Sequence, residues 1–181
     1  SNGNALHFKK ITKDKWLIET AGESTIIIIY NYYASELNAG STWLDNTQLY
    51  VNPINCLLYC DQKLEDPCHI EIIIPQDYEI ASALNVLSTS KENNQKIIKG
   101  ITEDYHTLVD TPFICSNSLQ HNLFVLDGVE FNVWFQGECK PDWAKIIGDF
   151  FIFINEQFVL FKNFPTERYH FLIQVLPYQF Y

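Results

Sequence analysis

The chain has 181 residues, of which 47% are hydrophobic and 15% aromatic, and its formal net charge is -10 at pH 7. This length suits one or two domains, and the apolar share is large enough to bury a core. The acidic excess argues against binding to nucleic acid or to anionic membrane surfaces, because both need a clustered cationic face. No stretch has the length and apolarity of a membrane span.

The first part of the chain alternates short apolar runs with turn residues. Leu6–Ile11 predicts an edge strand and Trp16–Thr20 a second short strand, with a turn after it. Thr25–Ala34 is the strongest β pattern, because β-branched and aromatic residues fill nearly every position, and it predicts a central strand.

Further strands are predicted at Thr42–Leu44, Gln48–Val51, Ile54–Tyr59, His69–Pro75 and Tyr78–Leu84. Ser88–Asn94 is polar and predicts a mobile loop, after which Ile97 and Ile98 return to the sheet. About eight strands at this spacing indicate an antiparallel sandwich or a barrel.

The pattern changes after residue 100. Residues 102–109 predict a short capped helix that Asp110-Thr111-Pro112 ends. Asn122–Leu126 and Val129–Phe135 predict the two arms of a hairpin, because Asp127-Gly128 between them suits two positions of positive φ.

The last forty residues predict a helix and a strand. Apolar residues recur from Trp143 to Phe161 with a period of 3.6, and Asp142 after a proline suits the N-cap, so a helix is expected over 142–162. The apolar run at 168–177 predicts a strand covered on both faces. The fold class is therefore mainly β, an antiparallel sandwich-like domain over 1–138 followed by a second unit over 139–181.

Residue chemistry alone predicts no activity. No histidine is followed by glutamate and no two histidines are four residues apart, so the helix motif of zinc peptidases is absent, as is the Gly-x-Ser-x-Gly motif of serine hydrolases. The densest polar group is Glu103–Asp110, in which two carboxylates and His106 suit acid–base chemistry. Helix capping and an exposed polar face explain the same residues better.

The five cysteines give an odd count, which favours small buried side chains in a reducing, cytoplasmic compartment over a disulfide framework. Their spacing matches no closed zinc site. The tyrosines are expected in the core, with a sugar-binding face as the alternative. This set is Tyr30, Tyr32, Tyr33, Tyr50 and Tyr59.

In order along the chain, several segments resemble the glycyl aminopeptidase family of zinc metallopeptidases, which is related to thermolysin. Ile29–Leu37 is similar to the family's central strand, with its Tyr-x-x-Tyr-Ala-x-Glu-Leu pattern, and Thr42–Asn46 to the segment after it. Ile73–Leu84 is similar to a strand–proline–aromatic–strand element. Asp104–Pro112 is close to Asp-Tyr-Asp-x-Leu-Val-Asp-Ser-Pro, with His106 in place of an acidic residue.

The resemblance implies an N-terminal β domain that precedes a catalytic domain, packs on it and helps to wall the substrate cleft. Phe164–Leu172 completes the order, and the chain stops before the family's Gly-x-Glu-His-like element and zinc helix, so we expect a fragment. No catalytic residue and no metal ligand are assigned. Zinc and the release of N-terminal residues from peptides are expected of the full-length protein, and no cofactor of this chain.

Tyr105, Asp110, Thr111 and Pro112 are the candidates for the interdomain or cleft contact, by match to the family motif. A tight turn without a further role explains Asp110–Pro112 equally well. The alternative function is a free-standing β-sandwich module that binds carbohydrate or protein through exposed tyrosines. Because residues 142–181 would expose apolar surface without a partner domain, they are expected to contact the missing catalytic domain or to self-associate.

Overall fold

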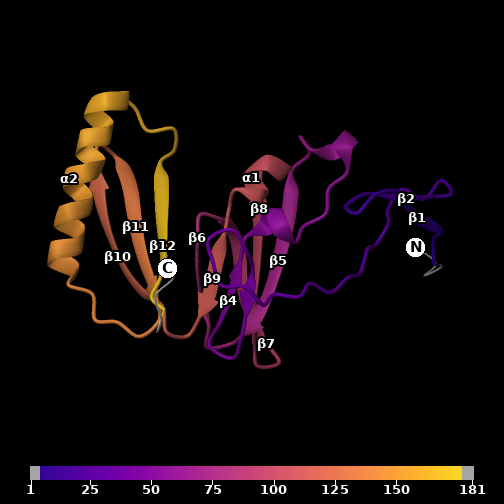
Figure 1. Cartoon of the computed structure of the whole chain (residues 1–181), viewed down its shortest axis with the longest axis horizontal. Coiled ribbons are helices and arrows are strands. Elements are labelled where there is room, and N and C mark those ends of the chain that lie inside the picture. The colour runs from indigo at the N-terminus through magenta and orange to yellow at the C-terminus, as the bar shows by residue number, and fades with distance from the viewer. Residues whose placement is uncertain (1–4, 177–181) are drawn as a thin grey trace. The chain divides into compact units, whose positions relative to one another are not determined.

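The computed structural model describes residues 5–176 and contains two compact units, Ser1–Tyr33 and Ala34–Tyr181 (Figure 1). The first unit holds the antiparallel pair β1 (Phe8–Lys10) and β2 (Trp16–Ile18), in which Phe8 lies opposite Ile18. Both predicted strands are confirmed. The predicted turn follows β2, with positive φ at Ala21 and Gly22.

The run Thr25–Ala34 is not the central strand that its composition predicted. Within residues 5–176 it belongs to no β ladder, and Ile29 is 91% exposed and Tyr33 88% exposed. β-branched residues favour an extended backbone, but a strand also needs a neighbour for its N–H and C=O groups. At its end the Ala34 carbonyl accepts from the Leu44 N–H at 3.1 Å, and the run otherwise joins no ladder of the described residues. The next residue, Ser35, forms an isolated antiparallel bridge with Trp43.

The second unit contains an antiparallel sandwich of two sheets. The first sheet has the order β3-β4-β9-β6 and the second the order β5-β8-β7. The strands of the first are β3 (Trp43–Leu44), β4 (Gln48–Val51), β6 (Glu79–Ser82) and β9 (Phe113–Ser116). Those of the second are β5 (Cys68–Pro75), β7 (Asn85–Glu92) and β8 (Gln95–Thr102). The core between the sheets includes Ile72, Ile98, Phe113 and Cys115.

A third sheet with the order β10-β11-β12 follows, built from β10 (Gln120–Leu126), β11 (Val129–Gln136) and β12 (Arg168–Gln174). The predicted hairpin is confirmed, with φ of 49° at Asp127 and 81° at Gly128. The helix α2 (Trp143–Phe161) connects β11 to β12, which runs parallel to β11. These bounds confirm the predicted helix and strand, although β12 ends at Gln174, before the predicted end, and Pro177 lies outside the described residues.

The second unit is layered. The sheet β3-β4-β9-β6 lies between the sheet β5-β8-β7 and the third sheet, so both of its faces are covered (Figure 1). Tyr50, Ala81 and Ile114 of the sheet β3-β4-β9-β6 pack toward Trp134 and Leu172 of the third sheet. The opposite face of the third sheet packs on α2 through Phe131, Ile154 and their neighbours. All four residues of β9 are buried for this reason.

Two further local predictions are wrong. Ile54–Tyr59 is not a strand, because the chain turns through a 3-10 helix at Pro53–Asn55, where the proline's missing N–H costs nothing. Ser88–Asn94 is not a loop, because β7 continues to Glu92 and only Asn93-Asn94 turn, with φ of 51° and 63°. β7 is exposed at every position, and within residues 5–176 it pairs with β8 alone, so its polar composition reflects exposure.

The hairpin of β10 and β11 precedes the predicted domain boundary at residue 138, yet it shares a sheet with β12. The division into 1–138 and 139–181 stays a prediction. Among residues 5–176, no helix is long and apolar enough to cross a membrane.

Candidate functional site

The candidate segment Asp104–Pro112 begins with the short helix α1 (Tyr105–Val109), within the predicted range. Asp104 is its N-cap, and its carboxylate accepts a hydrogen bond from the Thr107 backbone N–H at 2.6 Å. This bond and a further one to the Thr107 side chain hold the pKa of the Asp104 carboxyl below its usual value. Local capping therefore fixes where the segment starts.

Tyr105 connects the helix to the loop between β4 and β5. Its hydroxyl donates to the Leu57 carbonyl at 3.1 Å, and its backbone N–H donates to the Leu64 carbonyl at 2.9 Å. Its ring lies 5.2 Å from the ring of Tyr59, centroid to centroid. Tyr105 thus binds both ends of the loop 57–64, a structural role for the first of the four candidates. Sequence reasoning missed Leu57 and Leu64, because backbone acceptors leave no signal in residue types.

The remaining candidates form the end of α1. The Asp110 N–H donates to the His106 carbonyl at 3.1 Å, and the Thr111 hydroxyl donates to the Thr107 carbonyl at 2.6 Å. The Pro112 carbonyl accepts from the Ser82 hydroxyl at 3.2 Å, which ties the segment to β6. Thr111 is buried, whereas Asp110 is exposed, and within residues 5–176 its carboxylate takes part in no hydrogen bond or ion pair. Asp110 is therefore the candidate best placed to contact another domain or a ligand.

The segment offers no catalytic arrangement. Glu103, His106 and Asp110 are all exposed, and among the described residues no hydrogen bond or ion pair joins the His106 ring to a carboxylate or to a nucleophile, although His106 contributes to the lowered pKa of the Asp104 carboxyl. In the part of the chain that the structure describes, no group of three His, Cys, Asp or Glu side chains could hold a metal ion. The residues present do not fit zinc, and no reaction step is assigned to a metal here.

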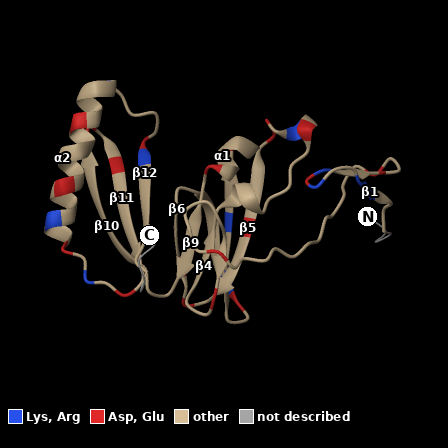
Figure 2. Cartoon of the chain, in the orientation of Figure 1, with Lys and Arg blue, Asp and Glu red and all other residues tan. Residues whose placement is uncertain are grey.

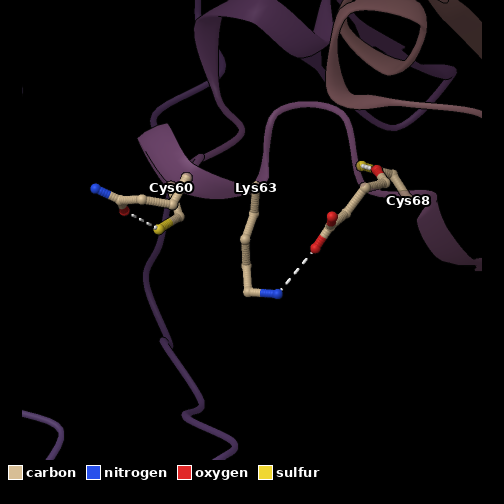
Figure 3. Close-up of polar contacts among 5 residues, drawn as sticks. Cys60, Lys63 and Cys68 are labelled. Carbon is tan, nitrogen blue, oxygen red and sulfur yellow. Dashed lines mark hydrogen bonds and ion pairs between the residues drawn. The ribbon is translucent and has the colours of Figure 1, made fainter.

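The five cysteines are in no disulfide and lie in different surroundings. Cys115 is fully buried, and burial raises the pKa of its thiol to about 12, so it stays protonated and unreactive. Cys60 is exposed and donates to the Gln62 side-chain oxygen at 3.1 Å, while Cys68 donates to the Asp66 carbonyl at 3.5 Å. Figure 3 shows these two thiols on either side of Lys63, directed at different partners. Only Cys115 fits the expectation of a small buried side chain.

A second candidate surface lies on the outer side of α2. Its exposed apolar residues are Ile152, Val159 and Leu160, whereas the partly exposed Phe151 and Phe153 lie nearer the sheet and contact Phe124 and Phe171. The charged residues Lys145, Asp149 and Glu156 follow each other at helical spacing, so they form one narrow polar ridge between apolar flanks (Figure 2). A helix that is apolar over most of its circumference is typical of a buried position. The exposed apolar surface expected of residues 142–181 is present.

We expect Tyr105→Phe to lower the free energy of unfolding by about 1 kcal/mol, because it removes one partly buried hydrogen bond and leaves the Leu57 carbonyl without that donor. Urea denaturation would measure the loss, and limited proteolysis would show faster cleavage within residues 57–64. Tyr59→Phe is the matched control, since Tyr59 is 62% exposed. Equal stability of the two variants would contradict the role given to the Tyr105 hydroxyl.

Comparison with known proteins decides the family. A model described as the peptidase M61 N-terminal domain matches residues 1–117, which run from the N-terminus to just past β9. This chain belongs to the peptidase M61 N-terminal domain family. The match confirms the resemblance that the sequence motifs indicated, and the M61 model includes the whole candidate segment Asp104–Pro112.

Two solved structures are similar to this M61 chain. The first is an aminopeptidase N family protein from Idiomarina loihiensis, with 22% identity and a TM-score of 0.78 over 97% of this chain and 30% of that chain. The second is an M1 zinc metallopeptidase from Deinococcus radiodurans, with 15% identity and a TM-score of 0.49 over 74% of this chain and 33% of that chain. The similarity to the Idiomarina loihiensis protein is a similarity of fold. The M61 chain spans about a third of either protein, and no curated protein matches it.

Proposed function

We propose that this chain is the non-catalytic N-terminal part of a zinc-dependent aminopeptidase, where it packs on the catalytic domain and helps to shape the substrate cleft. The observation that carries the proposal is the match of residues 1–117 to the M61 N-terminal domain. In this proposal the zinc and the hydrolysis of the peptide bond belong to the rest of the full-length protein.

Two surfaces support a packing role. Asp104–Pro112 is held to its own domain by backbone hydrogen bonds, so Asp110 would reach another domain from a fixed position. The outer side of α2 exposes residues such as Ile152 (64%) and Leu160 (72%). Covering such surface is favourable by roughly 25 cal/mol per Å². We assign Asp110 to the cleft side and α2 to the interdomain contact or to self-association.

The test compares this chain with one extended through the downstream reading frame. We expect this chain to bind no zinc and cleave nothing, and the longer chain to bind zinc and release N-terminal residues from peptides. In the longer chain, Asp110→Arg should lower kcat/KM about tenfold, which corresponds to roughly 1.4 kcal/mol. Glu103→Arg, also exposed, is the matched control.

The outcomes separate the parts of the proposal. A longer chain without zinc and without activity would overturn the peptidase assignment. An active longer chain in which Asp110→Arg and Glu103→Arg behave alike would remove Asp110 from the cleft and leave the domain assignment in place.

The runner-up function, a free-standing binding module, requires exposed aromatic side chains along one sheet. Of the five tyrosines expected in the core, Tyr50 is buried, and the expectation is wrong for the other four. The exposed Tyr30, Tyr32, Tyr33 and Tyr59 lie outside the strands of the described residues. No observation favours this function over the peptidase domain.

A further inference from the structure

The face of the third sheet that points away from α2 carries a polar network in which the role of each atom is fixed. The Asn132 side chain is 4% exposed, and its Nδ2 donates to Oε1 of Glu130 at 2.8 Å. Its Oδ1 lies 2.8 Å from Nε2 of His121. Because an ionised carboxylate only accepts, the amide cannot be turned around, and Oδ1 is the atom that faces His121. Nε2 of His121 is therefore the donor.

The tautomer of His121 follows from this network. With the proton on Nε2, the other nitrogen of the neutral ring, Nδ1, is an acceptor. The ring is stacked on Trp134, with the ring centroids 3.8 Å apart and an interplanar angle of 16°. His121 is exposed, and within residues 5–176 its Nδ1 takes part in no hydrogen bond or ion pair. The network thus leaves one acceptor of an exposed and oriented ring unused.

His170 provides the complementary group on the same face. The indole N–H of Trp134 can only donate, so Nδ1 of His170, at 3.3 Å, accepts and the proton of the neutral ring lies on Nε2. Burial lowers the pKa of His170 to about 4, which keeps this ring neutral at pH 7. Among the described residues its Nε2 has no hydrogen-bond partner, yet it is not sealed from solvent. This nitrogen is therefore an unused donor.

Aliphatic side chains of β10 border these polar groups. In an antiparallel pair, residues that lie opposite each other point to the same face of the sheet. Leu123 lies opposite Asn132, and Val125 lies opposite Glu130. Leu123 is 44% exposed and Val125 57% exposed. The face therefore combines an unused acceptor, an unused donor and an exposed aliphatic row.

We propose that this face binds an extended peptide segment, whose main chain donates an N–H to Nδ1 of His121 and accepts, through a C=O, from Nε2 of His170. An extended peptide offers both groups along its length and directs alternate side chains toward the surface. An aliphatic side chain of the peptide then packs on Leu123 and Val125. A water molecule or an ion would satisfy the polar atoms but would not cover this aliphatic row. The proposal does not depend on the peptidase assignment, because the site lies wholly within this chain.

A peptide titration followed by NMR of the histidine ring nitrogens tests the site in the unmodified chain, at about pH 8, where a histidine ring is normally neutral. The probe is N-acetyl-leucyl-leucine N-methylamide, whose blocked ends leave only main-chain groups and aliphatic side chains for recognition. Before the titration both His121 and His170 should carry their proton on Nε2. We expect saturable binding with a Kd of about 1 mM, together with a shift of both ring signals. A His121 ring protonated at Nδ1, no binding up to about 10 mM, or equal affinity for glucose would overturn the proposal.

Two substitutions remove the unused groups and keep the internal hydrogen bonds. His121→Gln retains a donor to Asn132 in place of Nε2. His170→Asn retains an acceptor for Trp134 in place of Nδ1. Each should weaken peptide binding about three- to tenfold, the usual loss for one hydrogen bond. His69→Gln, at an exposed position of β5, is the matched control and should bind like the unmodified chain. If binding survives both substitutions, or if His69→Gln weakens it equally, the proposal is wrong.

Discussion

Gly137→Ala should lower the free energy of unfolding by about 3–4 kcal/mol. Gly137 follows β11 with φ of +112°, a conformation that L side chains rarely adopt. A Cβ atom at this position would overlap the carbonyl oxygen of Val175. The overlap cannot be relieved by a side-chain rotation, and the Val175 N–H is bound to the Gln136 carbonyl at 2.8 Å. The substitution should therefore separate the end of β12 from β11.

Urea denaturation followed by tryptophan fluorescence would measure this loss, since Trp134 lies in the same strand as Gln136. Gly148→Ala is the matched control. Gly148 lies inside α2, and a Cβ there would meet no atom within 4 Å. Because alanine favours helix over glycine, this control should gain about 0.5–1 kcal/mol. If the two variants changed stability in the same direction, the packing argument for Gly137 would be wrong.

The second large effect is a loss of stability in mild acid caused by His170. The indole N–H of Trp134 donates to Nδ1 of His170 at 3.3 Å, so the folded chain needs the neutral imidazole. Burial, helped by the charges of Arg168 and His121 and opposed by Glu130, lowers the pKa of His170 to about 4. The usual value is 6.5.

The direction in which stability changes with pH follows from proton binding. Between pH 6.5 and 4 the unfolded chain binds a proton at His170 and the folded chain does not, so stability falls as the pH falls through this window. The difference in pKa corresponds to a loss of up to about 3 kcal/mol below pH 4. Above pH 6.5 both states hold the neutral ring, and the contribution vanishes.

Urea denaturation at pH 7 and pH 4.5 would measure this contribution. His170→Asn cannot take up a proton in this window, so its stability should fall by about 2–3 kcal/mol less than that of the unmodified chain. His106→Asn, on the exposed side of α1, should behave like the unmodified chain. A pH dependence that survives in His170→Asn would assign the acid sensitivity to other groups.

The elements that could be predicted from the sequence are those whose cause is local. Asp127-Gly128 provides two positions of positive φ, and the apolar residues of α2 recur with a period of 3.6 residues. Neither the hairpin turn nor the helix needs information from elsewhere in the chain. The prediction of a central strand at Thr25–Ala34 is wrong because a strand depends on a partner that composition does not reveal. The prediction of a loop at Ser88–Asn94 is wrong for the opposite reason, since this polar segment forms a strand by pairing with β8.

In the candidate segment, too, local features could be predicted from the sequence and long-range contacts could not. The capping of α1 by Asp104 lies within three residues and could be predicted. The contact from the Tyr105 hydroxyl to the Leu57 carbonyl spans 48 residues, and it depends on a loop that had been predicted as a strand. Residue identity selected Asp110, but only the structure distinguishes it from its buried neighbour Thr111.

The parallel pairing of β11 and β12 has a consequence for synthesis on the ribosome. Arg168 pairs with Glu130, from which it is 38 residues away, with α2 between them. At about 5–20 residues per second, β11 leaves the exit tunnel roughly 2–8 s before β12 can reach it. During that delay the hairpin presents an apolar face and an open edge, so the nascent chain needs α2 to fold promptly or a chaperone to shield it. A slowly translated stretch within residues 137–167 would lengthen this exposure.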